Sequence, residues 1–442
     1  MHLPRPQHPR PRPWLLACAL TLAIAGQASA DAVTDWNANF DAVAPAYGGP
    51  PQRAYLGAMV HIAIHDALNS IQRRYETYDA VPTANANASP DAAIAAAAHD
   101  VLIHELNRPP ASAAKTNAIA SIEASYATAL AAIPDGPAKD QGVAAGQAAA
   151  DAIIQARNLD GSATPNLPLS LAPGPGVYQP TAPNFPAAAN NGWALVKPFA
   201  MHEPSQFRSD PGEIFDLAGA AYARDYNEVK QVGELNARLG NPDSVRSDVA
   251  RFWPAGGADW NLVTRTIVAS RNLDRWQHAR LFALMQMGEA DAAISVFDTK
   301  YAYNYWRPVT AIRWNGGDGN PATTADPSWL PFFSFGPIWA TPPYPDYPCG
   351  LTTAAGATTE VLRRYFGSDQ VGYTLTVTAP AFGGLPAKPI TRTFASLSAA
   401  TADAVDARVF AGIHFRSGCV QGVRQGSQVG RYAIQHYLRP VK

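Results

Sequence analysis

Apolar residues recur with the period of an α-helix along most of this 442-residue sequence, which limits the chain to a mainly helical fold. The clearest case is YLGAMVHIAIHDALNSI, residues 55–71, where we expect an amphipathic helix. Its apolar stripe is formed by Leu56, Met59, Val60, Ala63, Ile64, Ala67, Leu68 and Ile71. Further helices are predicted at about 91–106, 112–132, 137–157, 397–411 and 417–438. Gly142 and Gly146, one turn apart among alanines, indicate a close helix crossing.

Two segments depart from the helical pattern. YTLTVTA and ITRTFAS alternate polar and apolar residues and predict a small β-hairpin near 372–395. Residues 158–211 are rich in Pro, Asn and Gly, and so long a loop is usually either functional or disordered. Its aromatic residues favour an ordered segment that packs on the helices, because disordered tracts are poor in such residues: Tyr178, Phe185, Trp193 and Phe199.

The first thirty residues have the layout of a secretory signal. A basic stretch, MHLPRPQHPRPRP, precedes the apolar WLLACALTLAIAG, and ASA ends at Ala30 as a cleavage site. A lipoprotein signal at Cys18 is less favoured, because that cysteine follows the charged region too closely. We therefore expect a periplasmic or secreted protein whose residues 31–442 form a single helical domain, with no further segment apolar enough to span a membrane.

The charge balance indicates no nucleic-acid or membrane partner. Lys and Arg number 34 against 35 for Asp and Glu, a net charge of −1. Removal of the signal would leave two cysteines, too few for a disulfide scaffold. A helical protein of this size can form homo-oligomers, but no sequence feature specifies an interface.

Two cations stand out in DTKYAYNYWRPVTAIR, residues 298–313. Lys300 and Arg307 are seven residues apart, so we expect them on one face of one helix that ends or kinks at Pro308. A solvated basic face is the common outcome for such a pair. The aromatic residues around them favour instead cations that bind a partner.

Two later stretches complete a set of anion-binding groups. In PPYPDYPCGLTTAAG, Gly350 opens a helix whose free amides could bind an oxyanion. In ARVFAGIHFRSG, Arg408 and His414 lie six residues apart and would converge only if Gly412 ends the helix between them. Arginine, lysine and a neutral imidazole suit a tetrahedral or trigonal oxyanion.

These three motifs, in this order, resemble the signature of the vanadium-dependent haloperoxidases and the type 2 phosphatidic acid phosphatase superfamily. HIAIHDALN and FDTKYAYNYWRPVTAIR look like its soluble bacterial haloperoxidase-like branch. The resemblance implies an all-α fold of helical bundles with the oxyanion, vanadate or phosphate, in the bundle core. It further implies that Lys300, Arg307 and Arg408 bind the oxyanion, with Cys349 and the Gly350 amide beside them. His414 would be the axial ligand of vanadium or the nucleophile toward phosphate, and His414 and Lys300 the catalytic residues.

The second motif departs from the pattern of the family. Pro-Ser-Gly-His is replaced by Pro348-Cys349-Gly350-Leu351, so a weaker thiol donor stands for the hydroxyl and the acid–base imidazole is absent. The serine that leads the third motif is Ala407. Loss of the imidazole harms the hydrolysis of an alkyl phosphate most, because a poor leaving group must be protonated.

We therefore favour hydrogen peroxide-dependent oxidation of halide by bound vanadate, with weakened acid–base catalysis. The alternatives are an acid phosphatase that acts on phosphate esters and a non-catalytic protein that binds phosphate or vanadate. Proton transfer through Asp346 or His65 stays open.

Two further pairs of residues could carry chemistry. His61 and His65 lie one turn apart, but no third and fourth zinc ligand follows, so we expect buried, hydrogen-bonded histidines. Cys349 and Cys419 each lie within five residues of a proposed ligand. If the motifs converge, the cysteines could form a disulfide, and two buried free thiols are the alternative.

Overall fold

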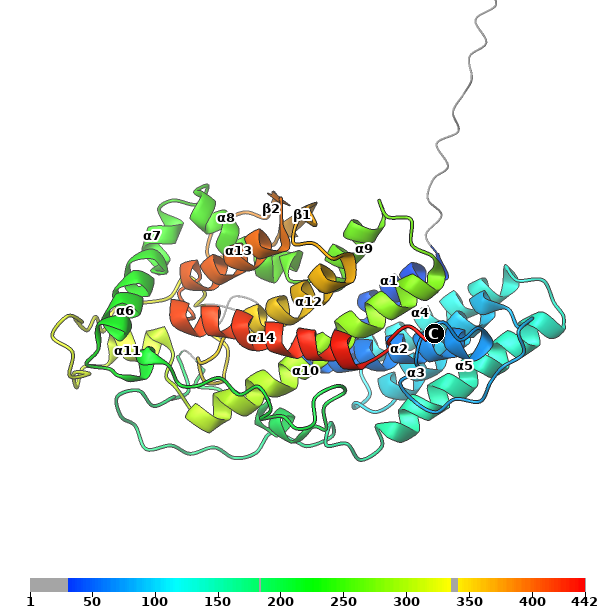
Figure 1. The fold of residues 1–442 in the computed structure, drawn as a ribbon. Helices are drawn as coiled ribbons and strands as arrows, with labels where there is room; N and C mark the ends of the chain where they lie inside the picture. Colours follow the sequence, from blue (N-terminus) through cyan, green and yellow to red (C-terminus); the bar gives the residue numbers. More distant parts are fainter. Residues whose placement is uncertain (1–30, 183, 335–340, 442) are drawn as a thin grey trace, which may run out of the picture.

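The computed structural model describes residues 31–182, 184–334 and 341–441, and in this part of the chain the fold is helical (Figure 1). The predicted signal segment, residues 1–30, lies outside the described residues. None of the described helices is long and apolar enough to cross a bilayer. The all-α fold class predicted from the sequence is confirmed.

Five helices form an N-terminal bundle, shown in blue to cyan in Figure 1. They are α1 (Ala32–Tyr47), α2 (Pro50–Ile71), α3 (Pro90–Leu106), α4 (Ala113–Ala131) and α5 (Pro137–Ala156). In α2 every residue from Ala54 to Ile71 is buried, so the expected amphipathic character is wrong although the helix is confirmed. The reason is that α1, α3, α5 and α10 surround it and leave no face for water.

The close helix crossing predicted from Gly142 and Gly146 is confirmed between α5 and α3. A Cβ at Gly142 would lie 2.4 Å from the carbonyl oxygen of Ser89, and one at Gly146 equally close to that of Ala93. Only glycine leaves room for the α3 backbone at these two positions.

One short helix lies within the long connection 158–211, and others follow it and lead to α10. They are η1 (Asn191–Leu195), η2 (Glu213–Phe215), α6 (Ala220–Val232), α7 (Leu235–Leu239), α8 (Val245–Phe252), η3 (Trp253–Gly257) and α9 (Trp260–Val268). In the described part of the connection, Tyr178, Trp193 and Phe199 are buried. Phe185 is the exception among its four aromatic residues, with 65% of its surface exposed.

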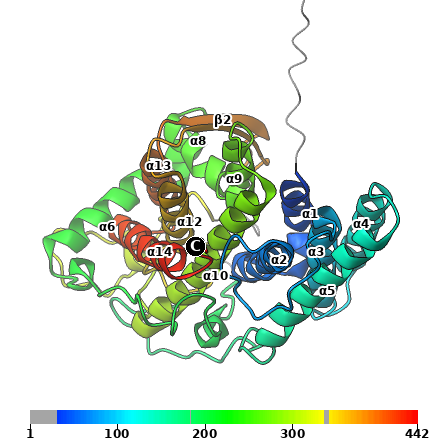
Figure 2. The same ribbon diagram turned by 45° about the vertical axis from the view of Figure 1, so that its right-hand side comes forward.

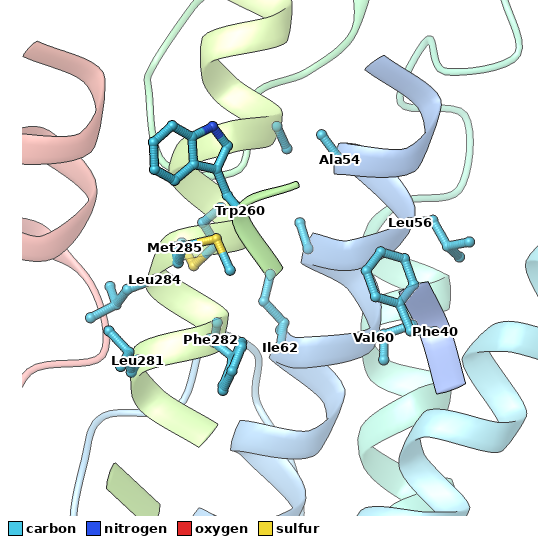
Figure 3. Packing of buried hydrophobic residues seen from close by; sticks show 14 of the residues in the cluster. Phe40, Ala54, Leu56, Val60, Ile62, Trp260, Leu281, Phe282, Leu284 and Met285 are labelled. Carbon is cyan, nitrogen blue, oxygen red and sulfur yellow. The ribbon is translucent and has the colours of Figure 1, made fainter. Parts of the chain in front are cut away.

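The longest helix, α10 (Arg275–Tyr303), lies between the two halves of the molecule (Figure 2). It begins with a capping box between Asp274 and Gln277, and it packs on α2 on one side and on α12 and α14 on the other. Figure 3 shows Ile62 of α2 with Phe282 and Met285 of α10 in this shared core. One hydrophobic core therefore joins both halves.

The C-terminal half consists of α11 (Pro308–Arg313), α12 (Gly350–Phe366), α13 (Leu397–Phe410) and α14 (Arg416–His436). The predicted hairpin is present as β1 (Tyr373–Ala379) and β2 (Lys388–Phe394), which pair antiparallel. Glycines bring α14 against α12, since a Cβ at Gly426 would lie 1.9 Å from the carbonyl oxygen of Thr353. This close contact sets the position of the N-terminus of α12.

Candidate functional site

Lys300 and Arg307 lie on two elements, which corrects the expectation of a single helix. The helix α10 ends at Tyr303 because Asn304 adopts a left-handed conformation, with φ of 52°. Arg307 is then the N-cap residue of α11, which starts at Pro308. The preference of Pro308 for the start of a helix explains this second element, and both cations remain fully buried.

Lys300 holds the approach to the second motif. Its ammonium group donates to the carbonyl oxygen of Pro345 at 2.8 Å and to that of Asp346 at 2.9 Å. It also donates to the carbonyl oxygen of Pro348. Burial lowers the pKa of Lys300 to about 7, and the charge of Arg307 adds to the shift. The three carbonyls accept all three protons of the ammonium group, so none is left to donate to an anion. Lys300 can therefore stabilise an anion here only through its positive charge.

Only part of the Arg307 guanidinium group is hydrogen-bonded to the described residues. Its Nε donates to the carbonyl oxygen of Tyr344 at 2.8 Å, and Nη1 donates to that of Ile413 at 2.8 Å. Nη2 is buried and has no hydrogen-bond partner among the described residues. The ring of Tyr344 lies 5.0 Å from the guanidinium carbon of Arg307 and 5.1 Å from Nζ of Lys300, so one aromatic face serves both cations.

His414 follows the turn predicted at Gly412, and α13 ends at Phe410. Gly412 has φ of 77°, and a Cβ there would lie 2.3 Å from the carbonyl oxygen of Gly233. Nη1 of Arg307 lies 3.1 Å from Nε2 of His414. Because arginine only donates, Nε2 is the unprotonated ring nitrogen.

Asp346 supplies a negative charge within this group of cations. Its Oδ1 lies 2.8 Å from Nδ1 of His414 and 3.8 Å from Nη1 of Arg307. Neither carboxylate oxygen is aligned for a hydrogen bond with a described residue, so the contacts are electrostatic. Of the two proton-transfer candidates considered, Asp346 is at the site, whereas His65 contacts Asp66 and Asn69 in α2.

Arg408 completes the cation set from the last turn of α13. It is 8% exposed, and its Nε is buried with no hydrogen-bond partner in the described part of the chain. The N-terminus of α12 has no side-chain cap, and nothing lies within 4 Å of a Cβ placed at Gly350. Free donors and open space thus coincide at one helix N-terminus.

Cys349 and Cys419 are free thiols in this structure, both fully buried. Burial favours a higher pKa for Cys349, but the hydrogen bond with Cys419 and the nearby His414 and Arg408 hold it well below its usual range. The ligand atoms of Cys349, His414 and Cys419 lie within 4.8 Å of one another, the one group of potential metal ligands found in the described residues. The surrounding cations oppose a divalent metal there and favour an anion.

His61 and His65 are buried, hydrogen-bonded residues, as expected. Nε2 of His61 lies 2.9 Å from Nδ2 of Asn37, and its ring stacks on Phe282. Burial lowers the pKa of His61 to about 3. Leu351, in place of the expected acid–base imidazole, packs on the apolar cluster around the two cysteines.

Sequence reasoning missed Tyr344 and the role of Tyr178. Tyr344 lies in the proline-rich approach to the second motif, and an aromatic residue so close to proposed oxyanion ligands was the available signal. The amide of Tyr178 donates to the carbonyl oxygen of Asn304, between the two cations, at 2.8 Å. No local pattern shows this contact, because Tyr178 comes from the distant connection 158–211.

The donors that remain free fit a tetrahedral oxyanion such as vanadate. Nη2 of Arg307 and Nε of Arg408 are buried without partners among the described residues, and the start of α12 has no side-chain cap. Such a constellation of arginines, helix amides and an unprotonated imidazole in a helical bundle defines an oxyanion-binding class of site.

Comparisons with known proteins agree with an oxyanion-binding site. Residues 280–442 match the family model described as the VCPO second helical-bundle domain. Vanadium chloroperoxidase of Curvularia inaequalis is 26% identical over 385 residues, covering 72% of this chain and 61% of the fungal protein. The chain thus spans about three fifths of the length of that relative.

Solved structures share the fold. A bacterial vanadium-dependent iodoperoxidase superposes with a TM-score of 0.70 at 22% identity, covering 93% of this chain and 98% of the other. A holo-type bacterial vanadium-dependent chloroperoxidase has a TM-score of 0.66 at 18% identity, covering 88% and 91%. The resemblance recognised from the three motifs is confirmed, since the family model, the curated relative and the solved structures all support the haloperoxidase-like branch.

Proposed function

We propose that this protein binds vanadate at the site formed by Arg307, Arg408, Gly350 and His414 and catalyses the oxidation of halide by hydrogen peroxide. The observation that carries the proposal is the pair of buried, unpartnered nitrogens, Nη2 of Arg307 and Nε of Arg408, beside the uncapped N-terminus of α12. Buried donors without partners are costly, and an oxyanion would satisfy them. The haloperoxidase names of the relatives support vanadate as that anion.

Each residue has a role that follows from its surroundings. The guanidinium groups and the α12 amides would hold the oxygens of the anion. Nε2 of His414 would hold it as well, once its hydrogen bond from Nη1 of Arg307 is released. The charge of Asp346, 2.8 Å from Nδ1 of His414, would favour the tautomer that carries the proton on that nitrogen. Lys300 would add its positive charge and keep residues 345–348 in place. Bound vanadate would supply the Lewis acid that activates hydrogen peroxide.

Acid–base help is weak in this site, since Leu351 cannot carry a proton. A second candidate is therefore a protein that binds the anion without turnover, and the packing of Leu351 on the cysteine cluster favours it. A phosphatase of the same architecture would be confined to esters with good leaving groups. We also propose that the protein is exported, as residues 1–30 predict.

Calorimetric titration of vanadate and of phosphate into the purified protein tests the proposal. Vanadate should bind to the wild type, and His414→Ala should weaken its affinity at least about tenfold, because the variant lacks the imidazole that would hold the anion. His436→Ala, an exposed histidine at the end of α14, is the matched control and should bind like the wild type. Equal vanadate affinity in His414→Ala, or none in the wild type, would contradict the proposal.

Restoring the missing imidazole distinguishes the proposed enzyme from a protein that binds the anion without turnover. In the presence of vanadate, bromide and peroxide, Leu351→His should raise turnover by about 10²- to 10⁴-fold if proton transfer limits the rate. Leu351→Asn is the control for a polar side chain that cannot transfer a proton. No turnover in any of the three proteins, despite vanadate binding, would support the role without catalysis.

A further inference from the structure

Cys349 and Cys419 lie at the starts of two helices that pack side by side, α12 and α14 (Figure 1). Cys349 is the N-cap residue of α12, and Cys419 lies in the first turn of α14, which begins at Arg416. Both side chains are fully buried and form an apolar cluster with Val405, against which Leu351 packs. Two thiols from distant parts of the sequence are thus enclosed in one small cluster.

Contacts of the backbone hold the two cysteines against each other. The amide of Cys349 donates to the carbonyl oxygen of Gly418 at 3.0 Å. The hydroxyl of Thr352 lies 2.8 Å from the carbonyl oxygen of Cys419 and 3.1 Å from that of Cys349. Gly422 permits this approach, since a Cβ there would lie 2.7 Å from the carbonyl oxygen of Cys349. The two helix starts are therefore held close enough for the cysteine side chains to meet.

The sulfur atoms are close to each other and to the proposed oxyanion site. Sγ of Cys349, Sγ of Cys419 and a ring nitrogen of His414 all lie within 4.8 Å of one another. An S–S bond is about 2.05 Å long, so the two sulfurs must approach each other to form one. Cys18 is the only other cysteine of the sequence and lies outside the described residues. Cys349 and Cys419 are therefore the one pair that the described residues can form.

We propose that hydrogen peroxide converts Cys349 and Cys419 reversibly into a disulfide, and that this disulfide weakens the binding of an oxyanion at the start of α12. One sulfur attacks the peroxide, the O–O bond breaks, and a sulfenic acid and a water molecule result. The second sulfur then attacks the sulfenic acid, the S–S bond forms, and the oxygen leaves as a second water molecule. The cysteines lose two electrons to the peroxide, and both thiol protons end in water.

Both sulfurs are fully buried, so their oxidation requires a local opening of the protein. The start of α12 is suited to such an opening, because it has no side-chain cap and nothing lies within 4 Å of a Cβ placed at Gly350. Hydrogen peroxide is uncharged and little larger than water, so a small opening admits it. The same molecule must enter this site in the proposed function.

The disulfide affects the anion because the cysteines lie next to its proposed binding groups. Cys349 precedes Gly350, and Cys419 follows His414 by five residues. In the reduced protein the thiol of Cys349 is a weak hydrogen-bond donor beside the site, whereas a disulfide has no S–H group. Loss of one such hydrogen bond corresponds to about two- to tenfold weaker binding. This effect on binding rests on the proposed function.

The test combines peptide mapping with calorimetry on the purified protein, treated with hydrogen peroxide and then freed of it. Proteolysis and mass spectrometry should find a cross-linked pair of peptides containing Cys349 and Cys419, which dithiothreitol separates. The oxidised protein should bind vanadate about two- to tenfold more weakly than the reduced protein. Treatment with dithiothreitol, removed before the titration, should restore the affinity. Cys349→Ser is the control, because it cannot form the disulfide and its vanadate affinity should not change with peroxide.

A peptide map without the cross-link, or with sulfinic acid at either cysteine in its place, would overturn the proposal. A cross-link that leaves vanadate affinity unchanged, or an equal loss of affinity in Cys349→Ser, would overturn it too. The two proposals fail separately. No vanadate binding by the reduced protein would reject the proposed function and the effect on binding, while the peptide map would still decide whether the disulfide forms. Vanadate binding without the cross-link would reject the disulfide alone.

Discussion

Asp346→Asn should lower the free energy of unfolding by about 3–5 kcal/mol, measured by chemical denaturation without added anion. This carboxylate lies 2.8 Å from Nδ1 of His414 and 3.8 Å from Arg307 and is fully buried. Removing one member of a buried charge group leaves the others uncompensated in a medium of low dielectric constant. Asparagine has nearly the same size as aspartate, so the loss of stability would measure the effect of removing the negative charge.

Asp298→Asn is the matched control, because Asp298 pairs on the surface of α10 with Arg208, which is 40% exposed. A surface pair of this kind is worth at most about 1 kcal/mol. Vanadate or phosphate should stabilise Asp346→Asn more than the wild type, since the bound anion restores the missing negative charge. A variant as stable as the wild type would show that Asp346 does not balance the cations.

Gly426→Ala should destabilise the protein by about 1–3 kcal/mol or more and reduce vanadate affinity together with stability. A Cβ at Gly426 would lie 1.9 Å from the carbonyl oxygen of Thr353, so α14 must move away from α12. Thr353 is in the first turn of α12, and the displaced helix end carries Gly350. Denaturation and calorimetric titration of the same preparations measure both effects.

Gly288→Ala provides a sharp contrast on α10. There a Cβ would lie 3.5 Å from Val361 and 3.7 Å from Gly430, which is ordinary contact. Replacing a helical glycine without a clash gains about 0.5–1 kcal/mol, so this variant should be more stable than the wild type. Equal effects of the two substitutions would mean that the α12–α14 contact tolerates separation.

Much of this fold could be predicted from the sequence because helical periodicity and glycine spacing are local signals. The hairpin, the crossing at Gly142 and Gly146 and the turn at Gly412 all follow from residues close in the chain. The error at Lys300 and Arg307 also has a local cause: Asn304, a residue that tolerates the left-handed conformation, ends α10 four residues before the proline.

The rest of the site depends on contacts between distant segments. Spacing cannot show that three carbonyls of the second motif would bind the ammonium of Lys300, nor that Tyr344 covers both cations. Burial on all sides of α2 likewise depends on neighbours that the sequence does not place. Asp346 could be named as a candidate, but its position next to His414 required the structure.

The 29 residues of α10 span about 43 Å between the halves of the molecule. The N-terminal bundle contributes none of the proposed oxyanion ligands, yet it fixes the helix that carries Lys300 at its far end. The bundle thus supports the position of a residue of the proposed oxyanion site without contributing a ligand to it. Substitutions in α1 to α5 can therefore change the position of Lys300 without contacting it.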